Sequence, residues 1–281
     1  MEKSEKKALQ IAACKIRMGA VESVWCAKSG HPGGALSAAD LIAYLYFKEM
    51  NVDPAAPRDP DRDRFVLSKG HSCPALYAAL ALKGYFAWDE LKKFRHIGAM
   101  LQGHPNMRET PGIDMSTGSL GQGVSAACGI ALAGKMDGKS YRVYSMLGDG
   151  ELDEGEVWEA AMFAAHHKLD NLCLMVDWNG LQIDGTIEEI AGPEPIDEKY
   201  RAFGFDVQTI DGHDFDAIER AFNHAKTVQG KPSMIVAKTV KGQGVSYMEN
   251  AVGWHGKAPN DEQYAVAKNE LTAELARLEA E

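Results

Sequence analysis

The chain has 281 residues, enough to bury one large hydrophobic core or two small ones. Its 45% hydrophobic and 25% charged residues are typical of a globular protein in water, and its net charge of −10 argues against a nucleic-acid or anionic-membrane surface. The charged start and the lack of a long apolar run predict neither a secretory signal nor a transmembrane helix, so we expect a cytoplasmic protein. Five scattered cysteines without a CxxC pair predict free thiols.

Helical periodicity dominates the first part of the chain. The spacing of apolar residues predicts helices over residues 5–28, 38–47, 74–83 and 88–94, and one short strand over residues 64–67. The glycines and the proline of residues 29–34 are expected to break the first helix, and Ser37 is a candidate cap for the second.

Strands and helices alternate more regularly in the rest of the chain. We expect helices over residues 124–135, 155–168, 215–228 and 261–281, and strands over residues 143–147, 172–176, 206–210 and 233–237. This alternation predicts an α/β fold with a mostly parallel sheet flanked by helices. No repeat or low-complexity linker interrupts it, so residues 1–281 are expected to form a single domain with helical N- and C-terminal extensions.

Two turns at the ends of successive predicted strands carry oxygen ligands. Gly148-Asp149-Gly150 follows one strand, Asn179 follows the next, and 28 residues separate Gly150 from Asn179. In a parallel sheet both turns lie at the carboxyl edge, where open α/β sheets bind ligands. Carboxylate and amide oxygens suit Mg²⁺, and the free amides of the following helix attract an anion. The pattern indicates a diphosphate held through a divalent metal; the alternative is a plain strand–helix–strand unit with a glycine turn.

Four histidines lie in turns that contain glycine or proline: His31, His71, His104 and His255. Each by itself is typical of a surface histidine. Together they indicate a pocket lined by groups that titrate near neutral pH, able to bond phosphate oxygens or sugar hydroxyls and to shuttle protons. No HxH or HxxxH spacing occurs among them, so they do not predict a metal site.

These motifs as a set resemble the transketolase family. The text from GDGELDEGEVWEA to DWNGLQIDG is similar to its thiamine diphosphate motif, STGSLGQG to its TGPLGQG loop, and SGHPGG, SKGHS, QGHP and WHG to its histidine motifs. The resemblance runs from about Lys15 to Pro259, which corresponds to the first of three transketolase domains. It departs from the family at Trp178, at Ser119 and at Gln243, which stands where the family has phenylalanine.

The resemblance implies a thiamine diphosphate-binding fold and a cofactor bound through Mg²⁺, or through Ca²⁺ or Mn²⁺. The metal ligands that it implies are Asp149, Asn179 and the carbonyl of Leu181. The cofactor-binding residues that it implies are His71, Gly118, Ser119, Leu120, Gly148, Asp149, Gly150, Glu151, Asn179, Leu181, Ile183 and His255. The catalytic residues that it implies are His31, His71, His104, His255 and Glu154. For Glu154 the alternative is helix-dipole compensation, since acids crowd the start of its helix.

The family's activating glutamate belongs to a second domain that this chain does not contain. The resemblance therefore implies the amino-terminal subunit of a split transketolase, which transfers a two-carbon ketol unit between sugar phosphates. It would be active only with a partner that carries the pyrimidine-binding and carboxyl-terminal domains, and two copies of each chain are expected. The alternatives are a subunit similar to deoxyxylulose-phosphate synthase, which SGHPGG and STGSLGQG match less well, and a non-catalytic cofactor-binding protein.

Overall fold

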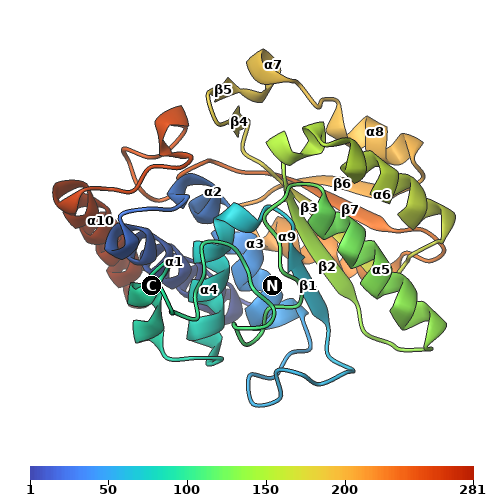
Figure 1. Ribbon diagram of the computed structural model, residues 1–281, viewed down its shortest axis with the longest axis horizontal. Coiled ribbons are helices and arrows are strands. Elements are labelled where there is room, and N and C mark those ends of the chain that lie inside the picture. Colours follow the sequence, from blue (N-terminus) through green and yellow to red (C-terminus); the bar gives the residue numbers. More distant parts are fainter.

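The computed structural model describes residues 1–281, and a five-stranded sheet lies at its centre (Figure 1). The strands are β1 (Arg64–Leu67), β2 (Val143–Gly148), β3 (Leu172–Trp178), β6 (Asp206–Asp211) and β7 (Ser233–Lys238). Their order is β1-β2-β3-β7-β6, and every neighbouring pair is parallel. The predicted α/β fold with a mostly parallel sheet is confirmed.

Helices cover both faces of this sheet, which explains why β2, β3 and β7 are buried along nearly their whole length. On one face lie α1 (Lys3–Ala27), α3 (Ala39–Tyr44), α4 (Cys73–Lys83) and α9 (Phe215–Thr227). On the other face lie α5 (Gln122–Met136), α6 (Gly155–His166) and α8 (Ile196–Ala202). Figure 1 shows the sheet between these two layers.

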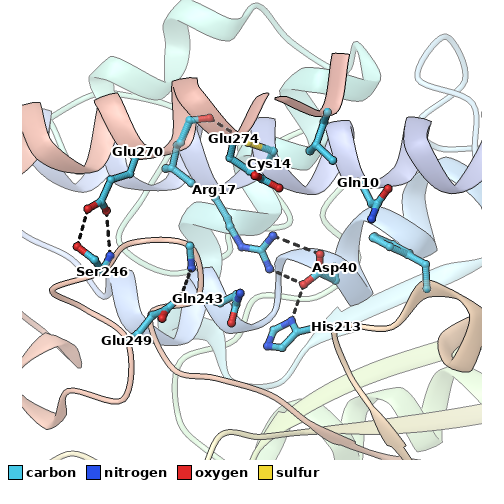
Figure 2. Close-up of a pocket in the computed structure, with 14 residues that line it drawn as sticks. Gln10, Cys14, Arg17, Asp40, His213, Gln243, Ser246, Glu249, Glu270 and Glu274 are labelled. Atoms are coloured by element: carbon cyan, nitrogen blue, oxygen red, sulfur yellow. Dashed lines mark hydrogen bonds and ion pairs between the residues drawn. The ribbon is translucent and has the colours of Figure 1, made fainter. Parts of the chain in front are cut away.

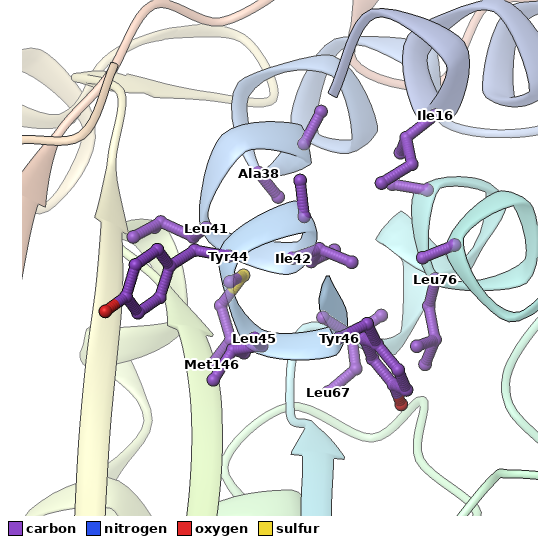
Figure 3. Packing of buried hydrophobic residues seen from close by; sticks show 14 of the residues in the cluster. Ile16, Ala38, Leu41, Ile42, Tyr44, Leu45, Tyr46, Leu67, Leu76 and Met146 are labelled. Carbon is purple, nitrogen blue, oxygen red and sulfur yellow. The ribbon is translucent and has the colours of Figure 1, made fainter. Parts of the chain in front are cut away.

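Strand β3 shows how alternate residues supply the two cores. Cys173 and Met175 belong to the first cluster, whereas Leu172, Leu174 and Val176 belong to the second. In the first cluster the side chains of α3 fill the space between the sheet and α4 (Figure 3). Because the sheet is buried on both sides, its carboxyl edge is a rigid platform for the turns that follow each strand.

The first and last long helices, α1 and α10 (Asp261–Ala280), lie side by side at one end of the molecule (Figure 1). Their contact belongs to a third apolar cluster, which includes Val21, Leu271 and Leu278. The thiol of Cys14 donates to the carbonyl of Leu271 across this contact at 3.3 Å. None of the helices is both long enough and apolar enough to cross a bilayer.

One local prediction is confirmed and one is wrong. The segment 29–34 breaks the first helix, since α1 ends at Ala27, but its last residues begin α2 (Pro32–Ser37), because proline fits the first turn of a helix. Its glycines are needed for close packing, since a Cβ at Gly33 would lie 2.8 Å from the carbonyl oxygen of Trp254. Ser37 is not a cap: it lies within α2, and its hydroxyl donates to Asp177 at 2.6 Å.

The region after β3 is also more structured than expected. It contains a short antiparallel hairpin of β4 (Leu181–Gln182) and β5 (Gly185–Thr186), followed by α7 (Ile187–Ile190). The side chain of Thr186 and that of Glu189 form a capping box at the start of α7. This hairpin extends beyond the sheet edge and carries part of the expected site (Figure 1).

The remaining elements are single turns. The chain leaves α3 through a π-helical turn, Leu45–Glu49. The 3₁₀ turns are Gly70–Ser72, Trp88–Lys93, Gly150–Asp153 and Val252–Trp254. Most of these turns flank the carboxyl edge of the sheet, where they bring backbone amides and side chains close to one another.

Candidate functional site

A cavity of about 200 Å³ opens at the carboxyl ends of β2 and β3, where the sequence predicts the site. The predicted residues that line it are His31, His71, Gly118, Leu120, Gly148, Asp149, Gly150, Glu151, Asn179, Leu181, Ile183 and His255. The other three do not line it. Ser119 and Glu154 are exposed elsewhere, and the ring of His104 lies 6.5 Å from that of His31, outside the cavity lining.

The proposed metal ligands lie on adjacent strand ends. The buried carboxylate of Asp149 accepts hydrogen bonds only from backbone amides, that of Gly150 at 2.9 Å and that of Gly180 at 2.6 Å. The side-chain oxygen of Asn179 accepts from the amide of Leu181 at 3.2 Å. Burial, and then the nearby carboxylate of Asp177, raises the pKa of Asp149 to about 6. A cation at this position would relieve both effects.

A lysine that sequence analysis did not single out faces these oxygens. The ammonium of Lys241 donates to the carbonyl of Leu181 at 3.0 Å and lies 3.2 Å from Nδ1 of His255. Lys241 is buried, and burial lowers its pKa to about 8. The cavity therefore holds a fixed positive charge beside the oxygen cluster, which favours an anionic ligand.

A second missed lysine lines the same cavity. Lys69 forms an ion pair with Asp177, and both side chains are almost completely buried. Lys69 also donates to the carbonyl of Gly34 at 2.8 Å. Burial opposes the ionisation of Asp177, but Lys69 and the hydroxyls of Ser37 and Thr239 hold the pKa of Asp177 below its ordinary value.

This ion pair also orients a proposed metal ligand. The amide nitrogen of Asn179 lies 3.5 Å from Asp177, so the side-chain oxygen of Asn179 points the other way. A carboxylate that holds the nitrogen end of an amide selects the orientation in which the amide oxygen can meet a cation. The sequence signals for both lysines are weak, because a lysine in a glycine-containing turn is ordinarily exposed.

Three of the four histidines meet inside the cavity. The ring of His31 lies 5.2 Å from that of His71 and 5.4 Å from that of His255, and His71 and His255 are 5.2 Å apart. Burial, and then the neighbouring cations, lowers the pKa of His31 and of His255 to about 4, and the same causes hold the pKa of His71 well below its ordinary value. Burial and Arg95 also lower the pKa of His104.

The expectation that the histidines titrate near neutral pH is therefore wrong for the three that line the cavity, His31, His71 and His255. Its physical reason is that the same cavity contains buried ammonium groups and little solvent, and both disfavour a second positive charge. At neutral pH these three imidazoles are uncharged, and each offers one donor and one acceptor nitrogen.

Glu151 has a structural place that the sequence does not predict. Its buried carboxylate accepts hydrogen bonds from the hydroxyl of Ser68 and from the amides of Gly121 and Gly148, the latter two at 3.0 Å. Burial raises the pKa of Glu151 despite these bonds. Glu151 thus joins the turns after β1 and β2 to the start of α5, and its oxygens are used within the protein.

A larger cavity, of about 470 Å³, lies behind the site between α1, α10 and the loop after β7 (Figure 2). Arg17, Asp40 and His213 form a chain of contacts on its wall, in which Arg17 and Asp40 are buried and Nδ1 of His213 lies 2.6 Å from Asp40. The other ring nitrogen of His213 accepts from the amide of Val240 at 2.9 Å. This cluster supports the loop that carries Lys241.

Comparison with known proteins identifies this architecture. Residues 8–277 match the family model described as the thiamine diphosphate binding domain of transketolase. The chain belongs to the transketolase family. Its Gly-Asp-Gly turn and Asn179 lie at the ends of the adjacent strands β2 and β3.

Two related transketolase subunits match along nearly their whole length. The 6-deoxy-6-sulfo-D-fructose transketolase subunit of Clostridium sp. (strain MSTE9) is 50% identical, over 95% of this chain and 98% of that protein. An apulose-4-phosphate transketolase subunit of Phocaeicola vulgatus is 42% identical over 97% of each. The crystal structure of the Campylobacter jejuni transketolase superimposes with a TM-score of 0.89 at 33% identity. That match covers 99% of this chain but 46% of the solved chain, so this transketolase chain spans about half of the longer protein.

Proposed function

We propose that this chain is the amino-terminal, diphosphate-binding subunit of a two-chain transketolase that moves a two-carbon ketol unit from a ketose to an aldose. The observation that carries the proposal is the convergence of Asp149, Asn179 and the carbonyl of Leu181 in the cavity that also holds three imidazoles. The near-complete match to proteins named as transketolase subunits supports the division into two chains.

The donor set fits a Mg²⁺-bound diphosphate. A carboxylate, an amide oxygen and a backbone carbonyl are hard ligands, and Mg²⁺ usually completes its shell with phosphate oxygens and water. Asp149 lacks a side-chain cation partner in the present structure, so the metal would supply the charge that its buried carboxylate lacks. Lys241 would then be free to turn from the carbonyl of Leu181 toward the diphosphate.

The remaining polar groups divide into two sets. His71, His255 and the amide of Gly150 would hold the diphosphate, because they lie with Lys241 around the oxygen cluster. His31 would face the sugar, since its ring lies between those of His71 and His255 on one side and that of His104 on the other. When bound, thiamine diphosphate supplies the nucleophilic carbon that carries the two-carbon unit.

We assign to this chain the task of binding the sugar hydroxyls and removing one proton, and uncharged imidazoles can do both. A neutral histidine can accept the proton of a sugar hydroxyl at one nitrogen and donate a hydrogen bond from the other. Burial and the nearby cations keep His31 in this form at neutral pH, with a pKa of about 4. We expect His31 and His104 to hold the hydroxyls of the donor sugar and to remove one proton from it.

We propose a donor ketose with an anionic group at its far end. The relatives quoted above are named for a sulfonated fructose and for a phosphorylated apulose, so phosphate and sulfonate donors are both to be tested. The deoxyxylulose-phosphate synthase alternative is less well supported, because the relatives and the solved structure quoted are all transketolases.

The metal assignment is tested by calorimetry with thiamine diphosphate and Mg²⁺ on the complex of this chain with its partner. Asp149→Ala and Asn179→Ala should each abolish Mg²⁺-dependent cofactor binding, because each removes one hard oxygen from the metal. Asp137→Ala, a change at an exposed position after α5, is the control and should bind like the wild type. Wild-type cofactor affinity in both Asp149→Ala and Asn179→Ala would contradict their assignment as metal ligands.

Dependence on a partner is tested by a ketol-transfer assay. This chain alone should show no turnover, and addition of a chain with the pyrimidine-binding and carboxyl-terminal domains should restore it. Robust turnover by this chain alone would overturn the two-chain proposal. Cofactor binding without turnover, with every donor and partner tried, would favour a non-catalytic cofactor-binding protein instead.

A further inference from the structure

Arg95 lies where two histidine-bearing segments of the site approach each other. It directly follows the turn Trp88–Lys93 and Phe94, has a left-handed backbone with φ of 61°, and its amide donates to the carbonyl of Leu101 at 2.9 Å. This backbone conformation is uncommon for a residue other than glycine, and such residues persist where their surroundings hold them in place.

The guanidinium of Arg95 bridges these two segments. One terminal nitrogen donates to the hydroxyl of Ser29 at 2.7 Å. The other donates to the carbonyl of Gly103 at 3.4 Å and lies 3.5 Å from Nδ1 of His31. Its Nε is buried without a hydrogen-bond partner, so the side chain keeps this position despite an unsatisfied donor.

The neighbouring glycines leave room for this arrangement. A Cβ at Gly103 would lie 2.9 Å from Nε of Arg95, so the guanidinium packs directly on the backbone next to His104. A Cβ at Gly118 would lie 3.2 Å from the ring of His104. The hydroxyl of Tyr77 donates to the carbonyl of His104 at 2.9 Å. The ring of His104 is therefore held against Gly118, while Arg95 connects its segment to that of His31.

We propose that Arg95 is a positioning residue for ketol transfer: it ties the segment of His31 to that of His104 and sets the distance between the two imidazoles that meet the sugar. The inference rests on the proposed function, which places the sugar beside these two histidines. Lysine can replace the charge of Arg95 but not its planar fork, which reaches Ser29 and Gly103 together.

The charge of Arg95 has a second consequence. Besides Arg95, the groups that face His31 are His71, His104, His255 and Lys241. Arg95 is the charged group that lowers the pKa of His104, and after burial it is the first cause of the low pKa of His31. Removing its charge should raise the pKa of both histidines toward the ordinary value. The acid limb of the activity profile should then move to higher pH.

The kinetic test compares Arg95→Met, Arg95→Lys and Lys93→Met in the complex with the partner subunit. Lys93 belongs to the same turn but is exposed and contacts only Glu90, so it is a matched control. We expect Arg95→Met to lower kcat by about 100-fold, the scale of loss for a misplaced catalytic group, with cofactor affinity unchanged and the acid limb at higher pH. Arg95→Lys should keep the wild-type acid limb and still lose turnover, because lysine retains the charge but not the fork. A merely structural defect would not move the acid limb of Arg95→Met.

A measurement that does not depend on catalytic activity tests the role of Arg95 independently of the proposed function. Histidine ring signals of the full chain can be titrated by NMR, with the exposed His224 as an internal reference. Arg95→Met should raise the pKa of His31 and that of His104; unchanged values for both overturn the inference, even if the complex proves inactive. If Arg95→Met does not fold, Arg95→Lys decides the matter, because wild-type kcat in that variant would contradict the bridging role.

Discussion

Lys69 and Asp177 show how one buried contact supports a polar site. Their ion pair lies at the wall of the cavity, and both side chains are almost completely buried. The hydroxyl of Ser37 donates to the same oxygen of Asp177 as Lys69 and that of Thr239 to the other oxygen, so the carboxylate stays ionised despite burial. A buried pair of this kind contributes little by itself relative to apolar packing, but removing one partner leaves an uncompensated charge.

We predict that Lys69→Met destabilises the chain by about 3–5 kcal/mol, because Asp177 is then buried without its cation. Lys135→Met is the matched control: Lys135 pairs with Asp170 at the surface, and its loss should cost about 0–1 kcal/mol. Urea unfolding of the isolated chain gives both values. Restored stability in the double variant Lys69→Met/Asp177→Leu would support the explanation, whereas a small loss in Lys69→Met would contradict it.

At the scale of elements, the start of α5 is held unusually close to the end of β1. The amide of Val124 donates to the hydroxyl of Ser68 at 3.1 Å, and Gly123 lies against the backbone of Ser68. Because Glu151 accepts from Ser68 and from Gly121, this contact also fixes the turn that carries Asp149. The glycine-rich approach to α5 therefore serves helix-to-sheet packing as well as the cavity.

Gly123 and Gly129 on the same helix provide a direct test of this packing. A Cβ at Gly123 would lie 2.7 Å from Cα of Ser68, whereas one at Gly129 would meet nothing within 4 Å. Gly123→Ala should destabilise the chain by about 1–3 kcal/mol through overpacking. Gly129→Ala should be neutral or stabilise it by up to about 1 kcal/mol, because alanine is the better helix former. Thermal unfolding of the two variants checks this, and equal effects would rule out the close contact as the cause.

At the scale of the whole molecule, the position of Glu154 distinguishes a role within this chain from a role that would need a partner chain. Glu154 is exposed at the start of α6, makes no capping bond with its side chain, and does not line the cavity. Within this chain it can only favour the helix dipole. A role near the cofactor, as the family resemblance implies, would require a surface that a second chain covers.

We predict that Glu154→Gln changes the free energy of unfolding of the isolated chain by less than about 1 kcal/mol, the scale of a helix-dipole contribution. In the complex it should lower ketol-transfer activity, because the carboxylate would then face the partner and the cofactor. Glu156→Gln, in the first turn of the same helix, is the control and should leave activity unchanged. If both variants turn over like the wild type, the charge of Glu154 serves only the helix.

The sequence by itself determined the fold class and the relation between Asp149 and Asn179. Apolar runs that alternate with helical periodicity specify a parallel sheet, and turns at the ends of adjacent parallel strands must share one edge. The sequence also indicated the four histidines, because each lies in a turn that contains glycine or proline.

Only the tertiary structure decided which charged side chains are buried beside these site residues. Lys69 and Lys241 are distant in sequence from each other and from Asp149, and nothing local distinguishes them from surface lysines. Arg95 likewise acquires its contacts from two remote segments. The physical reason is that desolvation and Coulomb interactions depend on distances through space, so the protonation of the site histidines follows from packing and not from motif spacing.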